Sequence, residues 1–171
     1  MHFYFDRLLY FLFTNSLLNK AIALDANNIP AYTNRGTVYE QQGKLELALA
    51  DLNKAIALDT NNTAAYNNQS VAYQKQRQYD LALEDINRAI QLNLNYALAY
   101  YNRGVIHTKQ EKHDRAVADY SKSIELDPNY ASAYRNRGLL YREQGNEDLA
   151  RQDLQTATEL SIQQNSTDTS P

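Results

Sequence analysis

Arginine and aspartate recur at matched intervals and are the side chains best placed to do chemistry together. Three arginines share one register of a repeating pattern, with Gln69 in the fourth place, and aspartates fill a second register throughout: Arg35, Arg103 and Arg137, then Asp51, Asp85, Asp119 and Asp153. A guanidinium and a carboxylate form paired, charge-assisted hydrogen bonds. The matched registers therefore predict Arg–Asp pairs between helices, with each arginine stem covering apolar surface. The alternative is a ladder of arginines that binds a ligand.

The histidines do not form a recognisable metal or catalytic site. The chain has three, His2, His107 and His113, and no cysteine. His107 occupies a register that otherwise holds tyrosine, and no carboxylate or thiol lies at ligand spacing on the same helix face. A glycine-rich phosphate loop and the usual nucleophile motifs are absent from the sequence. The sequence therefore predicts a protein that is not an enzyme and has no cofactor or metal.

Charge and hydropathy disfavour two classes of protein, nucleic-acid-binding proteins and membrane proteins. The net charge is -3 and the mean hydropathy is -0.65, which disfavours general attraction to nucleic acid and argues against a membrane protein. The longest apolar run near the N-terminus, Leu8–Phe13, is six residues long, whereas a membrane-spanning helix needs roughly 20. The sequence therefore predicts no membrane span, and the absence of cysteine favours a cytoplasmic protein.

A unit of 34 residues recurs without gaps and must position these side chains. The frames are 29–62, 63–96, 97–130 and 131–164, and each splits into two amphipathic helical segments. The first segment of each frame carries a small residue at one register, namely Gly36, Ser70, Gly104 and Gly138. Because glycine weakens a helix, we expect a close neighbour there, namely the alanine column of the second segment: Ala48, Ala82, Ala116 and Ala150.

The two ends differ from the repeats. Asn19–Asp25 matches Asn53–Asp59 letter for letter, so residues 1–28 are predicted to be a leading apolar helix that resembles the second half of a repeat. A weak membrane or partner anchor is the alternative for its aromatic start. In the last repeat, three columns that are mainly apolar in earlier repeats become polar, at Glu147, Arg151 and Thr158, which predicts a polar C-terminal face. Residues 165–171 are predicted to be disordered.

The repeating pattern resembles the tetratricopeptide repeat family. It reads Tyr–x3–Gly–x2–Tyr, then Ala–x3–large–x2–Ala, with Asp-Pro-Asn at one joint, and it covers 29–164 plus a half repeat before it. Tyr32, Tyr66, Tyr100 and Tyr134 stand where the family usually has tryptophan. The resemblance implies an all-α fold, an α-solenoid of about nine helices in antiparallel pairs that form a right-handed superhelix with a concave groove.

The resemblance also implies which residues line that groove. The positions carried over to this chain, together with two recurring asparagines, are Thr33, Thr37, Asn67, Asn68, Val71, Gln74, Tyr101, Asn102, Val105, Thr108, Lys109, Arg135, Leu139 and Arg142. Asn68 and Asn102 belong to one series with Asn34 and Asn136, and these asparagines are predicted to bond either a ligand backbone or the neighbouring helix. Some family members bind an acidic chaperone peptide through a carboxylate clamp, but only Asn68 matches that clamp here.

These observations predict a non-catalytic scaffold or adaptor that binds a peptide or protein segment in its groove. Basic residues on the first helices favour an acidic partner. One alternative is a nucleic-acid-binding helical repeat, which the net charge of -3 disfavours. Another is a fragment of a larger repeat protein that self-associates through its aromatic N-terminus. The partners expected are therefore proteins or peptides, with no nucleic acid.

Overall fold

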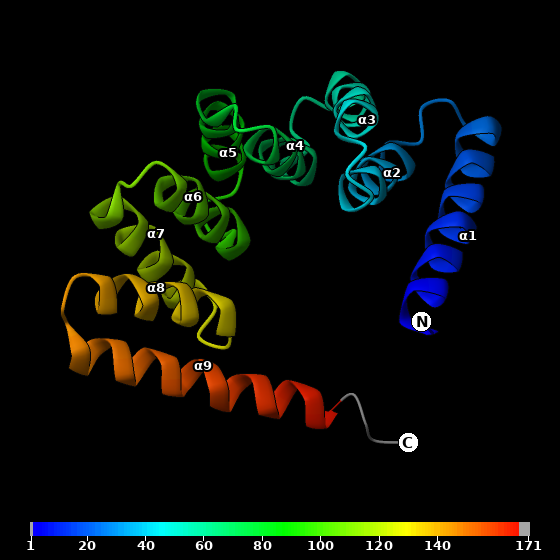
Figure 1. The fold of residues 1–171 in the computed structure, drawn as a ribbon. Coiled ribbons are helices and arrows are strands. Elements are labelled where there is room, and N and C mark those ends of the chain that lie inside the picture. Colours follow the sequence, from blue (N-terminus) through cyan, green and yellow to red (C-terminus); the bar gives the residue numbers. More distant parts are fainter. Residues whose placement is uncertain (1, 168–171) are drawn as a thin grey trace. The chain divides into compact units, whose positions relative to one another are not determined.

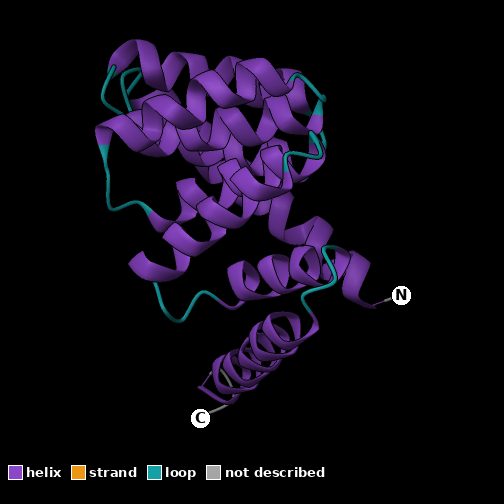
Figure 2. Cartoon of the chain, turned by 90° about the vertical axis from the view of Figure 1, so that its left-hand side faces the viewer, coloured by secondary structure: helices purple, strands orange, loops and turns teal. Residues whose placement is uncertain are grey.

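The computed structural model describes the backbone of residues 2–167 and the side chains of residues 10–164. Within this part of the chain the regular elements are all helices (Figure 2). In chain order they are α1 (His2–Leu24), α2 (Ile29–Gln41), α3 (Leu45–Leu58), α4 (Thr63–Lys75), α5 (Tyr79–Leu92), α6 (Ala97–Lys109), α7 (His113–Leu126), α8 (Ala131–Glu143) and α9 (Glu147–Thr167).

The helices fall into two compact units. Unit 1, Met1–Leu92, contains α1 to α5, and unit 2, Asn93–Pro171, contains α6 to α9. In unit 1, α2 packs on α3 and α4 on α5, and in unit 2, α6 packs on α7 and α8 on α9 (Figure 1). A three-residue turn joins the two helices of each pair, which makes the pair antiparallel. The prediction of an all-α solenoid built from antiparallel helix pairs is confirmed.

Each of these turns contains one residue with left-handed backbone. Gly43 and Gly145 have φ of 72° and 78°, and Arg77 and Glu111 adopt nearly the same value, 61° and 59°. In every turn the amide of the next residue donates to a carbonyl five residues back, as Lys44 does to Tyr39 at 2.8 Å. Arg77 and Glu111 therefore adopt a backbone conformation that glycine adopts more readily, and the turn between the helices is the same in all four repeats.

The glycines on the first helices do have a close neighbour on the second helix. The nearest atoms belong mainly to a large side chain, and not to the predicted alanine. A Cβ atom added at Gly36 would lie 2.8 Å from Cγ of Leu52, and one at Gly104 would lie 2.7 Å from Cε1 of Tyr120. At Gly36 the alanine column contributes only a backbone oxygen, that of Ala48 at 3.3 Å. The large residue one turn further along the second helix thus fills the space that glycine leaves.

The second half of α1 takes the place of a second helix in a repeat. Arg35 donates from Nη1 to Oδ1 of Asn19 at 2.6 Å, while Gln69 donates to Asn53 at 2.7 Å. Asn19 and Asn53 are equivalent in the 34-residue register, so α1 meets α2 as α3 meets α4. Among the described residues, no helix combines the length and the apolar character needed to cross a membrane.

The last helix presents its polar positions to solvent. Glu147, Arg151 and Thr158 are exposed in α9, whereas Leu45, Leu49 and Ile56 are half-buried at the equivalent positions of α3. The helix reaches Thr167, three residues into the segment predicted to be disordered, and residues 168–171 lie outside the described residues.

Candidate peptide-binding site

The structure confirms the predicted pairing of arginine with aspartate in three repeats. Arg35, Arg103 and Arg137 each donate from Nε and Nη2 to the two carboxylate oxygens of Asp51, Asp119 and Asp153, at 2.6–2.9 Å. The three aspartates are buried, and each pair joins the first helix of a repeat to its second. Hydrogen bonding to the carboxylate raises the pKa of each arginine. These arginines hold the helix pairs together and do not form a ladder for ligands.

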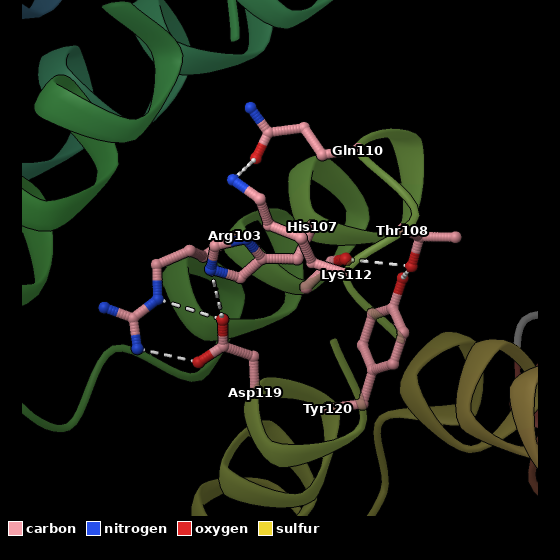
Figure 3. A network of polar contacts seen from close by, with 8 residues as sticks. Arg103, His107, Thr108, Gln110, Lys112, Asp119 and Tyr120 are labelled. Atoms are coloured by element: carbon pink, nitrogen blue, oxygen red, sulfur yellow. Dashed lines mark hydrogen bonds and ion pairs between the residues drawn. The ribbon is translucent and has the colours of Figure 1, made fainter. Parts of the chain in front are cut away.

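In unit 2 the carboxylate of Asp119 also lies near His107, with 3.8 Å between Nε2 and Oδ2 (Figure 3). Burial lowers the pKa of His107, so the imidazole is neutral at pH 7 and packs at a register that holds tyrosine in other repeats. Figure 3 also shows Tyr120 pointing to the other side of α7, toward Thr108. The neighbouring residues Asp119 and Tyr120 therefore contact different partners: Asp119 bonds Arg103, and Tyr120 bonds Thr108.

In unit 1, the predicted groove residues bond to one another. Thr33 and Asn67 are buried, with 7% and 1% of their surface exposed. Asn68 donates to Oγ1 of Thr37 at 2.8 Å, and Asn67 donates to Asn68 at 3.0 Å. Burial removes Thr33 and Asn67 from the surface, contrary to the prediction that they line an open groove. The recurring asparagine at 68 bonds the neighbouring helix rather than offering itself to a ligand.

The other predicted residues of unit 1 are partly exposed and lie beside an ion pair. Val71 and Gln74 are half-buried on α4. Next to them, Lys75 forms an ion pair with Glu40 of α2, so one positive charge of this face is neutralised within the unit. None of the predicted residues of unit 1 lines a described cavity of that unit.

In unit 2, five of the predicted residues line one cavity. Its volume is about 280 Å³, and it lies between α6 and α8 over the side chain of Tyr120. The lining comprises Tyr101, Val105, Thr108, Lys109, Tyr120, Asn136, Leu139, Leu140 and Glu143. Tyrosine, valine and leucine form the walls, and polar groups stand among them. A cavity of this kind accepts one apolar side chain and orients it through a few polar contacts.

A network of aromatic and polar contacts holds the cavity open. The ring of Tyr101 lies 5.8 Å from that of Tyr120 and 4.9 Å from that of Tyr130, edge-on to the latter. Tyr120 shares a 3.0 Å hydrogen bond with Oγ1 of Thr108, and Asn136 donates to the Tyr101 hydroxyl at 3.2 Å. Burial raises the pKa of Tyr120. Since these rings are fixed by bonds within the unit, the shape of the cavity is set before any ligand binds.

Positive charge is available on the same helices. Lys109, Arg135 and Arg142 are exposed, and Lys109 belongs to the lining of the cavity. Arg135 and Arg142 lie on α8 outside the lining, one turn before and about one turn after Leu139. Asn102, the last of the predicted residues, is half-buried on α6.

Two lining residues were missed by the prediction from sequence: Tyr120 and Leu140. Tyr120 was assigned to packing because its register holds Leu52, Ile86 and Leu154 in the other repeats. The replacement of an aliphatic residue by tyrosine in one repeat was the signal that could have revealed it. Its hydroxyl brings a polar group into a core register and thereby reaches the cavity.

The tetratricopeptide repeat matches most of this chain. One family model of that description matches residues 29–62 and 97–130, a second matches 63–96, and a third matches 120–152. No curated protein matches the sequence.

Solved structures of similar fold include proteins that bind peptides. A crystal structure of MamA is 30% identical, with a TM-score of 0.74, and the alignment covers 89% of each chain. YrrB, described as a TPR protein with an unusual peptide-binding site, is 25% identical over 90% of this chain and 79% of its own, with a TM-score of 0.65. The first TPR of Spaghetti (RPAP3), bound to the HSP90 peptide SRMEEVD, is 27% identical over 71% of this chain and 96% of its own, also with a TM-score of 0.65.

Proposed function

Because the chain belongs to the tetratricopeptide repeat family, we propose that it is a non-catalytic scaffold whose unit 2 binds a peptide or an extended protein segment. The observation that carries this proposal is the cavity of about 280 Å³ between α6 and α8. Its apolar walls suit one anchoring side chain. Its rings are fixed by internal hydrogen bonds, so little ordering is needed on binding.

The charges around the cavity define the chemistry of the segment. Lys109, Arg135 and Arg142 are exposed on α6 and α8, and Glu143 is the acidic residue of the lining. Three positive charges against one negative charge favour an acidic segment. We propose a ligand with one large apolar residue in the cavity and carboxylates on its flanks.

Two of the similar structures support a peptide ligand. YrrB is described as having a peptide-binding site, and the TPR of Spaghetti is bound to a peptide with three acidic residues. The chaperone clamp itself does not account for binding here, because Asn68, its one match in this chain, donates to Thr37 inside unit 1. The proposed site therefore uses unit 2 and its own residues.

A peptide-display selection followed by fluorescence anisotropy tests the proposal. We expect the full chain to select peptides with an apolar residue between acidic ones. The double variant Arg135→Ala/Arg142→Ala should weaken the best peptide by about tenfold or more. The control Arg115→Ala/Arg151→Ala removes the same charge from exposed positions of α7 and α9 and should change affinity by less than about twofold. Equal weakening by both double variants would contradict the site.

Self-association through α1 is a second candidate function. Tyr10, Leu12, Phe13 and Leu17 are 54–69% exposed on this helix. Such an apolar surface favours burial against another chain. Light scattering of three proteins tests this self-association: the unchanged chain, the variant Leu12→Ser/Phe13→Ser, and the control Ile162→Ser, which alters another exposed apolar residue. The same molecular mass for all three proteins would exclude self-association through this surface.

The remaining parts of the proposal concern location and ligand class. We propose a cytoplasmic location, to be tested by fractionation of cells that produce the chain. Nucleic acid is not among the proposed partners, since the net charge is -3. A single-stranded RNA probe that binds with a steep dependence on salt would contradict this part.

A further inference from the structure

The second repeat lacks the arginine that its aspartate meets elsewhere in the chain. Gln69 stands in the arginine register, and its amide donates to Oδ1 of Asn53 at 2.7 Å. Asp85 is the aspartate of this repeat. Its Oδ2 atom is buried and has no hydrogen-bond partner among the described residues. A buried carboxylate oxygen without a donor is unfavourable, and it is unique to this repeat among the four equivalent aspartates.

The other three repeats show what the register is built to hold. Each guanidinium lies between a carboxylate and the ring of a tyrosine on the same helix. The Cζ atoms of Arg35, Arg103 and Arg137 lie 5.4–5.7 Å from the ring centres of Tyr32, Tyr100 and Tyr134. A second tyrosine, Tyr39 or Tyr141, stands 5.7–5.8 Å away in two of them. The second repeat keeps both rings, as Tyr66 and Tyr73, without the cation.

A cavity in unit 1 is lined by two of the equivalent side chains, Tyr66 and Asp85. Its volume is about 480 Å³, and its lining consists of Tyr66, Glu84, Asp85, Asn87, Arg88 and Gln91. Tyr66 and Asp85 are the equivalents of the ring and the carboxylate that hold a guanidinium in the other repeats. Glu84 and Arg88 carry opposite charges, so ionised Asp85 leaves the lining with one net negative charge.

The electrostatics of Asp85 agree with a missing cation. Burial, with a smaller effect of Glu84, raises the pKa of Asp85 to about 7. Burial raises the pKa of Tyr73, and the charge of Asp85 contributes to the same shift. A positive group beside Asp85 would favour its ionised form and lower its pKa.

We propose that this cavity, called the Asp85 site, binds the guanidinium group of an arginine side chain presented by a partner polypeptide. Tyr66 stacks on the guanidinium and Asp85 accepts its hydrogen bonds, as the equivalent tyrosine and aspartate do in the three complete repeats. Tyr73 corresponds to the second tyrosine that two of those repeats have. A planar guanidinium fits this arrangement, whereas a lysine ammonium offers neither a bidentate donor pair nor a flat face. The Asp85 site lies in unit 1 and does not depend on the proposed function of the unit 2 cavity.

Nuclear magnetic resonance of the full chain with short peptides tests the Asp85 site. The probes are acetyl-Ala-Ala-Arg-Ala-Ala-amide and the same peptide with citrulline or lysine in place of arginine. The arginine peptide should shift the resonances of Tyr66 and Asp85 and move the titration of the Asp85 carboxyl to lower pH. The citrulline peptide should leave both unchanged. Equal binding of the lysine or citrulline peptide would overturn the assignment to guanidinium.

Two variants should abolish the site by different routes. Asp85→Asn removes the charge that the guanidinium needs, and Gln69→Arg supplies an internal arginine that fills the site. Each should reduce affinity for the arginine peptide by tenfold or more. Circular dichroism verifies that both are folded. Undiminished binding to the folded Gln69→Arg variant would place the peptide elsewhere and overturn the proposal.

A third variant should create a second site. Arg35→Gln gives the first repeat the arrangement of the second, with Asp51 beside Tyr32 and Tyr39 and no arginine. The arginine peptide should then bind two sites per chain instead of one, with new shifts at Tyr32. A folded Arg35→Gln variant that still binds one peptide would show that the carboxylate and the rings do not suffice, and would contradict the proposal. Loss of binding at the unit 2 cavity affects none of these outcomes.

Discussion

The two units carry the same helix pairs but use their inner positions differently. Thr33 and Asn67 in unit 1 share one register with Tyr101 in unit 2, and Thr37 and Val71 share another with Val105. In unit 1 the small polar side chains form hydrogen bonds with one another, and Thr33 and Asn67 are buried. In unit 2 the larger rings and aliphatic groups surround a cavity of about 280 Å³.

The difference follows from what each kind of side chain needs. A threonine or asparagine between two helices must find a hydrogen-bond partner, and the nearest is the same kind of residue on the next helix. The apolar atoms of tyrosine, valine and leucine need no hydrogen-bond partner, so the packing of these side chains can leave space between helices. At these inner positions of the first helices, the same fold therefore gives bonded polar side chains in unit 1 and a cavity in unit 2.

The aspartates provide a second contrast between the units. Asp119 in unit 2 accepts two hydrogen bonds from Arg103, whereas Asp85 at the equivalent position of unit 1 has a buried oxygen without a donor. The same substitution, aspartate to asparagine, should therefore have opposite effects on stability in the two units.

The largest effect is expected at Asp119. Asp119→Asn leaves the guanidinium of Arg103 half-buried without its counter-charge and should lower the free energy of unfolding by about 2–3 kcal/mol. Urea unfolding followed by circular dichroism measures it. A double-mutant cycle with Arg103→Gln isolates the pair, and a coupling energy of zero would show that the two residues contribute independently.

Gly104 is the next test, because it packs against Tyr120, whose side chain lines the cavity of unit 2. A Cβ atom at this position lies 2.7 Å from the ring of Tyr120, so Gly104→Ala should destabilise the protein by about 1–2 kcal/mol despite the better helix propensity of alanine. The urea midpoint reports the change. The matched control is Ser70→Ala in unit 1, where a side chain is already accommodated. It removes the hydrogen bond from Oγ of Ser70 to the carbonyl of Asn67, so its effect should stay within about 1 kcal/mol. Equal changes in the free energy of unfolding for Gly104→Ala and Ser70→Ala would contradict the close contact between Gly104 and Tyr120.

Asp85→Asn should stabilise the protein, and only at higher pH. Burial raises the pKa of Asp85 from 3.8 to about 7, so the folded state holds the proton more tightly than the unfolded state. The aspartate therefore lowers stability progressively from about pH 4 to pH 7, and this penalty is complete above pH 7. Since solvent screens a partly exposed charge, the variant should gain about 1 kcal/mol at pH 8 and almost nothing at pH 4. Melting temperatures over this pH range measure the gain, and a gain independent of pH would contradict the assignment to Asp85.

Much of the fold and part of the site follow from the sequence. The repeating pattern predicted the helix pairs, and the matched registers of arginine and aspartate predicted three ion pairs that the structure contains. Of the predicted groove residues, Tyr101, Val105, Thr108, Lys109 and Leu139 line a cavity. Thr33 and Asn67 do not reach a surface, because their burial depends on partners in the neighbouring helix that the register alone does not specify.

What the sequence by itself determined is the period, because local helix propensity and a fixed repeat of apolar residues dictate which faces meet. It also showed that Gln69 interrupts the arginine series. Only the tertiary structure decided the consequences of such exceptions. The side chain of Tyr120 lines a cavity, and the carboxylate of Asp85 has an oxygen without a donor while burial raises its pKa to about 7. Both depend on distances between helices, and side-chain packing in three dimensions sets those distances.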